Sequence, residues 1–316
     1  MTDTDFVTAF APASIGNLAV GYDMLGLAIA GPGDRVSVRK TNAQGVNILE
    51  VRGIDGEIHP FLDTDATTNT ASIAAAALWA EHGDDGGIEM IVHKGIPLQS
   101  GMGSSAASAV AGVVATNALL DTPLENASLL RYALEGEKFA SGGLHADNVA
   151  PSLLGGLILC PAELLPQTLR IAVPQGVSSV LVHPDLQVNT ADSRNGLARG
   201  YTMDQWLMQQ GYLATFLAAC AANDIDLIGR SLRDIIIEPQ RAASVPCLAA
   251  AKEAAFQAGA LGCSLSGSGP SIFALTRDAD AANVTTAMEQ ACRKMGYECQ
   301  SWVSPVETAG ACVEEA

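Results

Sequence analysis

The sequence has few basic residues. Its 316 residues include 17 Lys and Arg against 34 Asp and Glu, which gives a formal net charge of -17 at pH 7. Such an acidic protein repels the phosphate backbone of nucleic acids and anionic membrane surfaces, so we expect neither as a partner. The negative net charge does not exclude a small anion such as a nucleotide as a ligand, because a single loop can provide a locally favourable site.

Long apolar runs and metal-type cysteine spacings are also missing. The longest charge-free run, residues 95–120, is broken by Pro, Gln, Gly, Ser and Asn and is a poor candidate for a transmembrane helix. The seven cysteines form no CxxC or other zinc spacing, so we interpret them as reduced thiols. The first six residues carry two Asp and no basic residue, unlike a signal peptide. These absences together predict a cytoplasmic protein.

A glycine-rich loop, residues 97–107, leads directly into an apolar helical pattern. Glycines allow the backbone to approach a ligand closely, and the first turn of a helix offers free N–H groups and a partial positive charge. Ser104 and Ser105 add hydroxyl groups at the same place. The loop is therefore a candidate phosphate-binding site.

The loop has three other possible interpretations. No Lys-Ser or Lys-Thr follows the second glycine, which excludes a Walker A loop. The pattern Gly101-x-Gly103-x-x-Ala106 does fit a dinucleotide fingerprint, with Asp121 20 residues after Gly101. That acid should end a second strand, however, whereas the segment after Pro123 is predicted to be helical. An ordinary glycine loop that caps a helix is the simplest alternative.

The loop resembles the phosphate loop of the GHMP kinases (galacto-, homoserine, mevalonate and phosphomevalonate kinases). The Pro-x-x-x-Gly-x-Gly-Ser-Ser-Ala pattern of that family is complete from Pro97 to Ala106. Residues 260–275 match the third motif of the family nearly letter for letter. Residues 11–26 and 145–151 are similar to motifs of the homoserine kinase branch, Ala-Pro-Ala-Ser and His-x-Asp-Asn-Val-Ala-Pro. The resemblance therefore spans almost the whole chain.

The sequence departs from the branch pattern at a few positions. Gly16 stands where Ala is usual and Tyr22 where Phe is usual, and neither change removes a polar contact. Cys312 stands where many homoserine kinases have a basic residue. The sequence gives no explanation for the change at Cys312.

The resemblance implies a two-domain α+β fold of the GHMP kinase type. Residues 1–165 would form an N-terminal nucleotide-binding α/β domain, and residues 166–316 a ferredoxin-like C-terminal domain. The activity implied is transfer of the γ-phosphoryl group of ATP, with Mg²⁺, to the side-chain hydroxyl of L-homoserine. That reaction belongs to threonine biosynthesis, and the resemblance is compatible with a homodimer.

The resemblance also assigns the residues that bind ATP. A segment at Asn69 lines the adenine pocket in the family, although capping of a helix is the simpler interpretation of an Asn at that place. Lys94 precedes the phosphate loop and approaches a phosphate on this interpretation, whereas most lone loop lysines are solvated. The other assigned residues are Pro97, Ser100, Gly101, Met102, Gly103, Ser104 and Ser105 in the loop, and Gly267, Ser268 and Gly269 in the third motif.

Glu137 is the candidate magnesium ligand, together with Ser105. A helix is predicted over Asn126–Ser141, and Glu137 falls on the same face as the apolar residues Leu130, Ala133 and Leu134. Acids are seldom buried without a partner, and a magnesium ion would supply one. Glu135 points elsewhere, within reach of Arg131. The alternative is that Glu137 lies at the half-exposed edge of the apolar stripe.

The candidate substrate-binding residues are polar groups in apolar or glycine-rich surroundings. A buried amide or carboxylate must be paired or must meet a ligand, although turn capping is an alternative for the first two residues. The fork-shaped guanidinium of arginine suits a carboxylate such as that of homoserine. The set is Asn17, Asp23, His145, Asn148, Thr190, Arg194 and Arg241, with Thr190 expected as a helix N-cap.

The resemblance assigns catalysis to positioning and charge neutralisation by Glu137, Asp147, Asn148 and Arg194. Whether Asp147 acts as a general base is open, since some GHMP kinases use an aspartate here and homoserine kinases are thought to manage without one. Three other functions remain as alternatives: a sibling kinase acting on another small alcohol, a non-catalytic binding or regulatory protein of the same fold, and, more distantly, a dehydrogenase.

Overall fold

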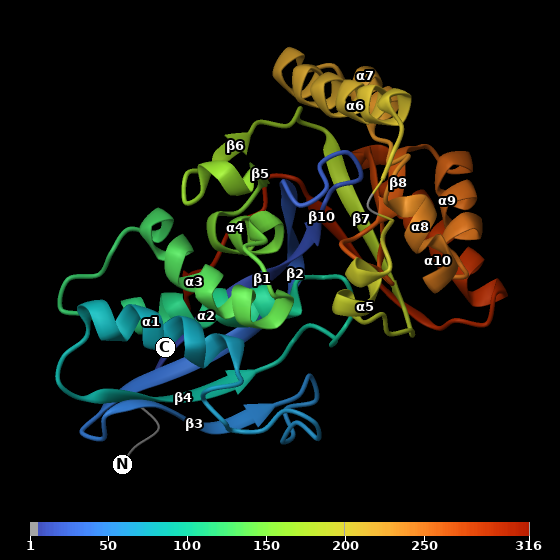
Figure 1. Cartoon of the computed structure of the whole chain (residues 1–316). Coiled ribbons are helices and arrows are strands. Elements are labelled where there is room, and N and C mark those ends of the chain that lie inside the picture. Colours follow the sequence, from blue (N-terminus) through green and yellow to red (C-terminus); the bar gives the residue numbers. More distant parts are fainter. Residues whose placement is uncertain (1–5, 199, 316) are drawn as a thin grey trace.

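The computed structural model describes residues 6–198 and 200–315, and it contains two β-sheets (Figure 1). The larger sheet has the strand order β11-β1-β2-β4-β3, and β5 pairs with β2 and β6. The smaller sheet has the order β10-β7-β9-β8 and is antiparallel throughout. The strands of the larger sheet are β1 (Val7–Gly16), β2 (Leu25–Thr41), β3 (Gly45–Arg52), β4 (Gly87–His93), β5 (Leu157–Leu159), β6 (Leu169–Ile171) and β11 (Cys312–Val313).

Strand β1 carries the N-terminal motif and pairs with β2 in the larger sheet. Ala9, Ala11, Ala13 and Ile15 are fully buried, the period of two expected for one face of a strand. The pairing of β1 with β2 shifts register between Pro12 and Ser14. A proline cannot donate to the ladder, so an irregularity at this position is expected. The shifted end of β1 leads into the turn that contains Asn17.

Four helices cover one face of the larger sheet (Figure 1). They are α1 (Thr70–His82), α2 (Ser104–Asn117), α3 (Asn126–Ser141) and α4 (Ala146–Leu154). Helix α2 packs against both central strands and the other three helices, and its residues from Ala106 onward are buried. Small side chains make this burial possible, because α2 is built mostly from Ala, Ser, Gly and Val. The first turn of α2 is thereby fixed rigidly beside β1.

The smaller sheet consists of β7 (Val177–Pro184), β8 (Ala260–Leu265), β9 (Ile272–Arg277) and β10 (Cys299–Pro305), with α9 (Leu248–Gln257) and α10 (Ala281–Lys294) packed on it. If these four strands are numbered 1 to 4 along the chain, their order across the sheet is 4-1-3-2, which is the ferredoxin-like arrangement that the resemblance implied. The two-domain α+β expectation is confirmed. Four helices of very different length connect β7 with α9: α5 (Thr190–Asn195), α6 (Met203–Ala222), α7 (Ile225–Ser231) and α8 (Glu238–Arg241).

The predicted elements differ from the structure in three places. The sequence predicts strands at residues 36–39 and 46–51 around a polar turn. Both strands exist, but β4 lies between them, antiparallel to β2 and parallel to β3. The sequence also predicts a helix over residues 227–234, but this helix ends at Ser231, and the Asp234 carboxylate instead accepts backbone N–H groups of residues 236–238. Helix α4 was not expected. Three short 3-10 turns, Ala162–Leu164, Ala242–Ser244 and Asp278–Asp280, complete the described elements.

The division of the chain at residues 165 and 166 stays a prediction. Two strands beyond that point, β6 and β11, pair within the larger sheet. One continuous apolar cluster also joins β1 and β2 to residues of the second half, including Phe216 and Phe273. The two sheets therefore share a core.

The described residues bear on two further expectations. All seven cysteines are free thiols, as expected. Within residues 6–198 and 200–315, none of the helices combines the length and apolar character that crossing a bilayer requires.

Candidate active site

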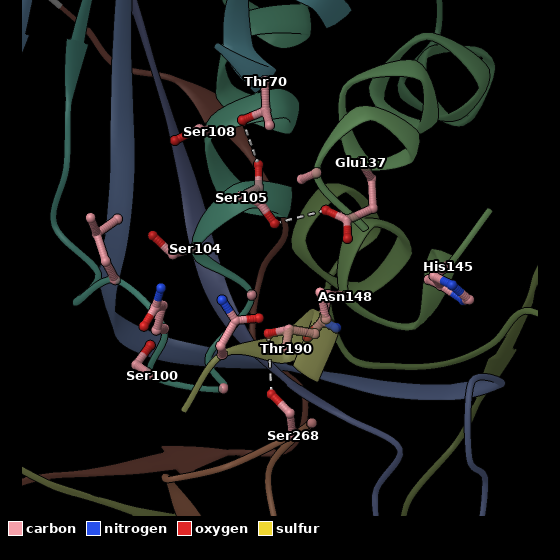
Figure 2. Close-up of a pocket in the computed structure, with 18 of the residues that line it drawn as sticks. Thr70, Ser100, Ser104, Ser105, Ser108, Glu137, His145, Asn148, Thr190 and Ser268 are labelled. Carbon is pink, nitrogen blue, oxygen red and sulfur yellow. Dashed lines mark hydrogen bonds between the residues drawn. The ribbon is translucent and has the colours of Figure 1, made fainter. Parts of the chain in front are cut away.

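A cavity of about 460 Å³ lies where the two sheets meet, and segments from the whole chain line it (Figure 2). The turn after β1, the loop between β4 and α2, and the start of α4 come from the first half. Helices α5 and α8 and the β8–β9 turn come from the second half. Nearly all predicted site residues line the cavity: Asn17, Asp23, Asn69, Lys94, Ser100, Gly101, Gly103, Ser104, Ser105, Glu137, His145, Asp147, Asn148, Thr190, Arg194, Arg241, Gly267 and Ser268.

The phosphate-type loop depends on two glycines in the left-handed region. Gly101 has φ +74° and Gly103, the N-cap of α2, has φ +70°. A Cβ atom on Gly101 would lie 2.4 Å from the Ser266 carbonyl oxygen, and one on Gly103 would lie 2.5 Å from Ser14 Oγ. Since Gly103 has no side chain, the first N–H groups of α2 receive no side-chain cap and face the cavity mouth.

The β8–β9 turn closes over this loop. Ser266 Oγ donates a hydrogen bond to the Gly101 carbonyl at 2.6 Å, and the Ser271 N–H donates to the Ser100 carbonyl at 3.1 Å. The third motif therefore faces the phosphate-type loop. The contact ties the two halves of the chain together at the cavity.

Lys94 is buried and fully engaged. Its ammonium group donates to the Asp34 carboxylate, to the Ser104 carbonyl at 3.0 Å and to Ser108 Oγ at 2.6 Å. An ammonium has three protons, so these contacts use all of its donors. The alternative of a solvated loop lysine is wrong. Lys94 instead connects the fully buried Asp34 to the first turn of α2.

Glu137 and Ser105 meet at the opposite side of the loop (Figure 2). Ser105 Oγ donates to Glu137 Oε2 at 2.9 Å, and Glu137 is only 7% exposed, so the half-exposed alternative is wrong. Residues 6–198 and 200–315 contain no group of three or more His, Cys, Asp or Glu able to hold a metal. Magnesium commonly binds one or two carboxylates plus substrate phosphates and water. One carboxylate and one hydroxyl beside a phosphate-type loop fit such an ion.

Glu135 lies on another face of α3, as expected, but its partner differs from the prediction. Its carboxylate lies 3.8 Å from the Lys138 ammonium, and both side chains are about half exposed. Arg131, expected near Glu135, pairs with Glu81 at 2.7 Å. The reason is that α1 packs beside α3 and presents Glu81 to Arg131.

Asn17 and Asp23 form one connected group with Arg194. Asn17 has φ +67°, its Oδ1 accepts the Asp23 N–H at 3.0 Å, and its Nδ2 donates to the Gly267 carbonyl at 3.1 Å. Arg194 donates to both carboxylate oxygens of Asp23 at 2.7 and 2.8 Å. This bidentate contact raises the pKa of Arg194. His145 Nδ1 lies 3.7 Å from Asp23, and burial lowers the pKa of His145.

Arg241 is a buried cation with spare hydrogen-bonding capacity. It is 4% exposed and donates from Nη1 to the Gly267 carbonyl at 2.9 Å. Its Nε has no hydrogen-bond partner among the described residues, and burial lowers the pKa of the group. A buried cation of this kind suits an anionic ligand.

Asp147 and Asn148 lie in the first turn of α4. Asp147 Oδ2 accepts the Asn17 N–H at 3.2 Å. Burial, followed by the charges of Asp23 and Glu137, raises the pKa of Asp147 to about 7. Asn148 Oδ1 accepts from Ser14 Oγ at 3.0 Å. These contacts link β1, α4 and the phosphate-type loop.

Several predicted residues behave differently from the expectation. Pro97, Met102 and Gly269 do not line the cavity, and Met102 is fully buried in the core. The N-cap of α5 is Asn189, whose side chain accepts the Asp192 N–H, so the expected capping role of Thr190 is wrong. Thr190 Oγ1 instead lies 3.2 Å from Ser268 Oγ (Figure 2).

Asn69 has both features that the sequence suggested. Its side chain caps α1 by accepting the Ala71 N–H at 3.0 Å, and it also lines the cavity. The dinucleotide alternative is wrong, because Asp121 has a fully exposed side chain and the segment after Pro123 continues into helix α3.

Sequence reasoning missed several residues at the site. Asp34, Thr70 and Ser108 hold the start of α2, and Thr70 Oγ1 donates to the Ser105 carbonyl at 3.1 Å. An acid inside an apolar strand is the signal that could have indicated Asp34. Tyr22 was noted only for its departure from Phe, yet it lies 5.7 Å from Arg194 and 5.4 Å from Arg241, measured from ring centroid to Cζ.

Comparison with known proteins agrees with this geometry. The family model for the GHMP kinases N terminal domain matches residues 69–156, and the GHMP kinases C terminal model matches residues 216–294. The chain belongs to the GHMP kinase family. Its relatives include the homoserine kinase of Xanthomonas campestris pv. campestris (strain B100), 44% identical over 96% of this chain and 92% of the relative. The homoserine kinase of Chlorobium phaeovibrioides is 40% identical over 96% and 98%.

Solved structures of GHMP kinases share the fold. The crystal structure of homoserine kinase from Cytophaga hutchinsonii has a TM-score of 0.93 and 41% identity, with 99% of both chains covered. Lactococcus lactis galactokinase complexed with galactose has a TM-score of 0.69 at 15% identity, covering 98% of this chain and 95% of its own. The second likeness concerns the fold alone.

Proposed function

We propose that this GHMP kinase is a homoserine kinase, which transfers the γ-phosphoryl group of ATP to the side-chain hydroxyl of L-homoserine in threonine biosynthesis. The observation that carries the proposal is the pairing of two features in one cavity. A phosphate-type loop at the start of α2 faces a group of acid and arginine side chains suited to an amino acid. Relatives named homoserine kinase at 40–44% identity support the substrate.

The phosphates of ATP would lie over residues 100–105 at the free N–H groups of α2. Glu137 and Ser105 would hold Mg²⁺, which neutralises charge on the phosphates when it is bound. Lys94 would act indirectly, because its donors are used by Asp34, Ser104 and Ser108. Its charge still lies next to the loop and favours the anionic nucleotide.

Homoserine is a zwitterion, and the cavity offers groups of both signs. We assign its carboxylate to Arg194 and Arg241 and its ammonium to Asp23. Asn17, His145, Asn148 and Thr190 complete the polar lining. His145 is mostly neutral at pH 7, since burial lowers its pKa, so it can accept or donate a hydrogen bond without adding charge.

Phosphoryl transfer needs positioning and charge stabilisation more than covalent help. We assign the hydroxyl proton to the Asp147 carboxylate, and a pKa of about 7 supports this assignment because it suits a general base at neutral pH. Transfer by positioning alone is the alternative. It predicts that Asp147→Asn retains turnover, whereas a base role predicts a large loss of kcat and removal of the acidic limb of the pH profile.

Coupled measurement of ADP release tests the proposal. L-homoserine, mevalonate and galactose are compared as acceptors at equal concentrations with ATP and Mg²⁺. Turnover with homoserine alone is the expected result. Preference for another alcohol would indicate a sibling kinase, and binding of ATP without turnover of any acceptor would indicate a non-catalytic protein.

Arg241→Ala gives a sharper test of the substrate. Losing a buried charged contact costs roughly 2–5 kcal/mol, so the homoserine KM should rise well over tenfold while the ATP KM stays nearly constant. Homoserinol, which has an alcohol in place of the carboxylate, should be a poor substrate for the wild type and less sensitive to the mutation. Equal losses of kcat/KM for both substrates would show that Arg241 does not bind the carboxylate.

A cytoplasmic location and a homodimeric state complete the proposal. Cell fractionation tests the location, and size-exclusion chromatography with light scattering tests the dimer.

A further inference from the structure

Tyr22 lies behind the cavity wall rather than in it. It follows a left-handed turn at Asn17, Leu18 and Ala19 and precedes Asp23, which has φ +56°. The side chain is half-buried and does not line the cavity. Its ring lies against two residues that do, Arg194 and Arg241.

The two arginines are like charges held near one aromatic ring. The Arg194 and Arg241 Cζ atoms lie 5.7 and 5.4 Å from the Tyr22 ring centroid. The charge of Arg194 adds to the effect of burial in lowering the pKa of Arg241, so the two guanidinium groups repel each other. Arg194 is neutralised by Asp23, whereas Arg241 has no ion pair within the described part of the chain. Something other than an acid must therefore hold Arg241 in place.

An aromatic ring attracts cations through its negatively polarised face, within about 6 Å of the centroid. Both arginines meet this distance. Burial and Asp23 raise the pKa of Tyr22, so the phenol keeps its proton and adds no negative charge of its own. The attraction is that of a neutral ring.

We propose that the Tyr22 ring is a positioning platform, which holds the guanidinium groups of Arg194 and Arg241 next to each other for the substrate carboxylate. The inference rests on the proposed function, because the carboxylate is that of homoserine. A neutral ring can align two cations without pairing with either, whereas an acid at this place would compete with the substrate. The platform therefore leaves Arg241 available to the ligand.

The test compares Tyr22→Leu, which removes the ring, with Tyr22→Phe, which keeps it. Tyr297→Leu is the control, since Tyr297 is also partly buried but packs in the C-terminal core. Tyr22→Leu should raise the homoserine KM about tenfold and leave kcat and the ATP KM within about twofold. Tyr22→Phe should stay within about threefold of the wild type, and Tyr297→Leu should not change the homoserine KM.

Homoserinol separates positioning from a general structural defect. Tyr22→Leu should change its KM little, because it lacks the carboxylate that the arginines receive. An unchanged homoserine KM in Tyr22→Leu, a Tyr22→Phe variant as impaired as Tyr22→Leu, or equal losses for homoserine and homoserinol would each overturn the platform.

A spectroscopic measurement makes the test independent of activity. The ring current of Tyr22 should shift the side-chain Nε–Hε NMR signals of two arginines in the wild type and in Tyr22→Phe, and Tyr22→Leu should abolish both shifts. Arginine signals that are identical in all three proteins would refute the contact. If Tyr22→Leu does not fold, the two shifted signals can be assigned with Arg194→Lys and Arg241→Lys, each made in the Tyr22→Phe background. Each change should remove one of the two shifted signals, and shifted signals that remain in both variants would refute the contact. A wild type that turns over no homoserine would refute the proposed function but leave this contact testable.

Discussion

Glu137 and Glu135 are two residues apart on α3 but have different surroundings. Glu137 is buried against Ser105, whereas Glu135 is half exposed beside Lys138. Glu137→Gln should lower kcat/KM by roughly 100-fold or more, because a bound metal supplies several kcal/mol of charge stabilisation. Glu135→Gln should be nearly silent, since exposed ion pairs contribute little. ADP release titrated with Mg²⁺ measures both variants, and equal impairment of the two would contradict the assignment.

Asp147 should make folding stability depend on pH. Its pKa is about 7 in the folded protein against an ordinary value of 3.8. Between these two pH values the folded state therefore binds more protons than the unfolded state. Stability is therefore lost as pH rises through this range, by about 4 kcal/mol at pH 8 and less than half of that at pH 5. Asp147→Asn has no charge to bury.

Urea unfolding of the nucleotide-free, magnesium-free protein checks this prediction. Asp147→Asn should gain stability relative to the wild type at pH 8 and gain much less at pH 5. If the free energies of unfolding of Asp147→Asn and the wild type differ by the same amount at both pH values, Asp147 is not a buried acid with a raised pKa.

At the scale of residues, motifs in the sequence indicated most of the cavity lining but few of its pairings. Lys94 was singled out, yet Asp34 was not, because their contact depends on the register of β2 and β4. Arg35 pairs with His93 in that ladder, which brings the neighbouring Asp34 and Lys94 together. Such a register cannot be derived from local sequence. The same holds for Tyr22, whose partners are far away in the chain.

Among the elements, the start of α2 depends most on its glycines. Gly103→Ala would place a Cβ 2.5 Å from Ser14 Oγ and 3.0 Å from Asn148 Oδ1. It should weaken ATP binding at least about tenfold, because the loop must move away from the phosphate position. Isothermal calorimetry measures the affinity.

Gly176→Ala is the matched control for this variant. Gly176 has φ +84°, similar to the +70° of Gly103, but a Cβ there meets nothing within 4 Å. Gly176→Ala should lose about 1 kcal/mol of stability from left-handed strain, and Gly103→Ala should lose more, because its Cβ also lies 2.5 Å from Ser14 Oγ. Only Gly103→Ala should lose ATP affinity, and an equal affinity in the two variants would refute the role of the loop.

Periodicity predicted the longer helices well and the short ones poorly. The bounds of α3 agree with the expectation, since its pattern runs over four turns. Helix α4 was missed because it has nine residues, contains Pro151 and follows glycines. Its packing against β1 and β2, which local sequence does not reveal, holds it in helical form.

The whole molecule should unfold as one unit despite its two sheets. The shared apolar cluster crosses from β1 and β2 to Phe216 and Phe273, and β6 and β11 return to the larger sheet. Calorimetry of the full chain should show a single transition. A fragment of residues 1–165 should not fold alone, since it lacks both returning strands and leaves the edge of β1 unpaired.

Circular dichroism and thermal melting of that fragment check the prediction. A cooperative transition in residues 1–165 would contradict it and would support the division at 165 and 166. The strand order of the smaller sheet was predictable only through the family resemblance. The insertion of β4 between β2 and β3 could not be predicted from the sequence, because the pairing of distant strands is decided by the assembled core.

On the proposed assignment, the Asp23–Arg194 pair would give substrate binding the character of an exchange reaction. The two side chains satisfy each other at 2.7 and 2.8 Å. A zwitterionic amino acid can replace that one internal contact by two new ones, ammonium with Asp23 and carboxylate with Arg194. A simple amine or a simple carboxylic acid would replace one partner and leave the other uncompensated. On that assignment, the cavity would discriminate against singly charged molecules before any shape is compared.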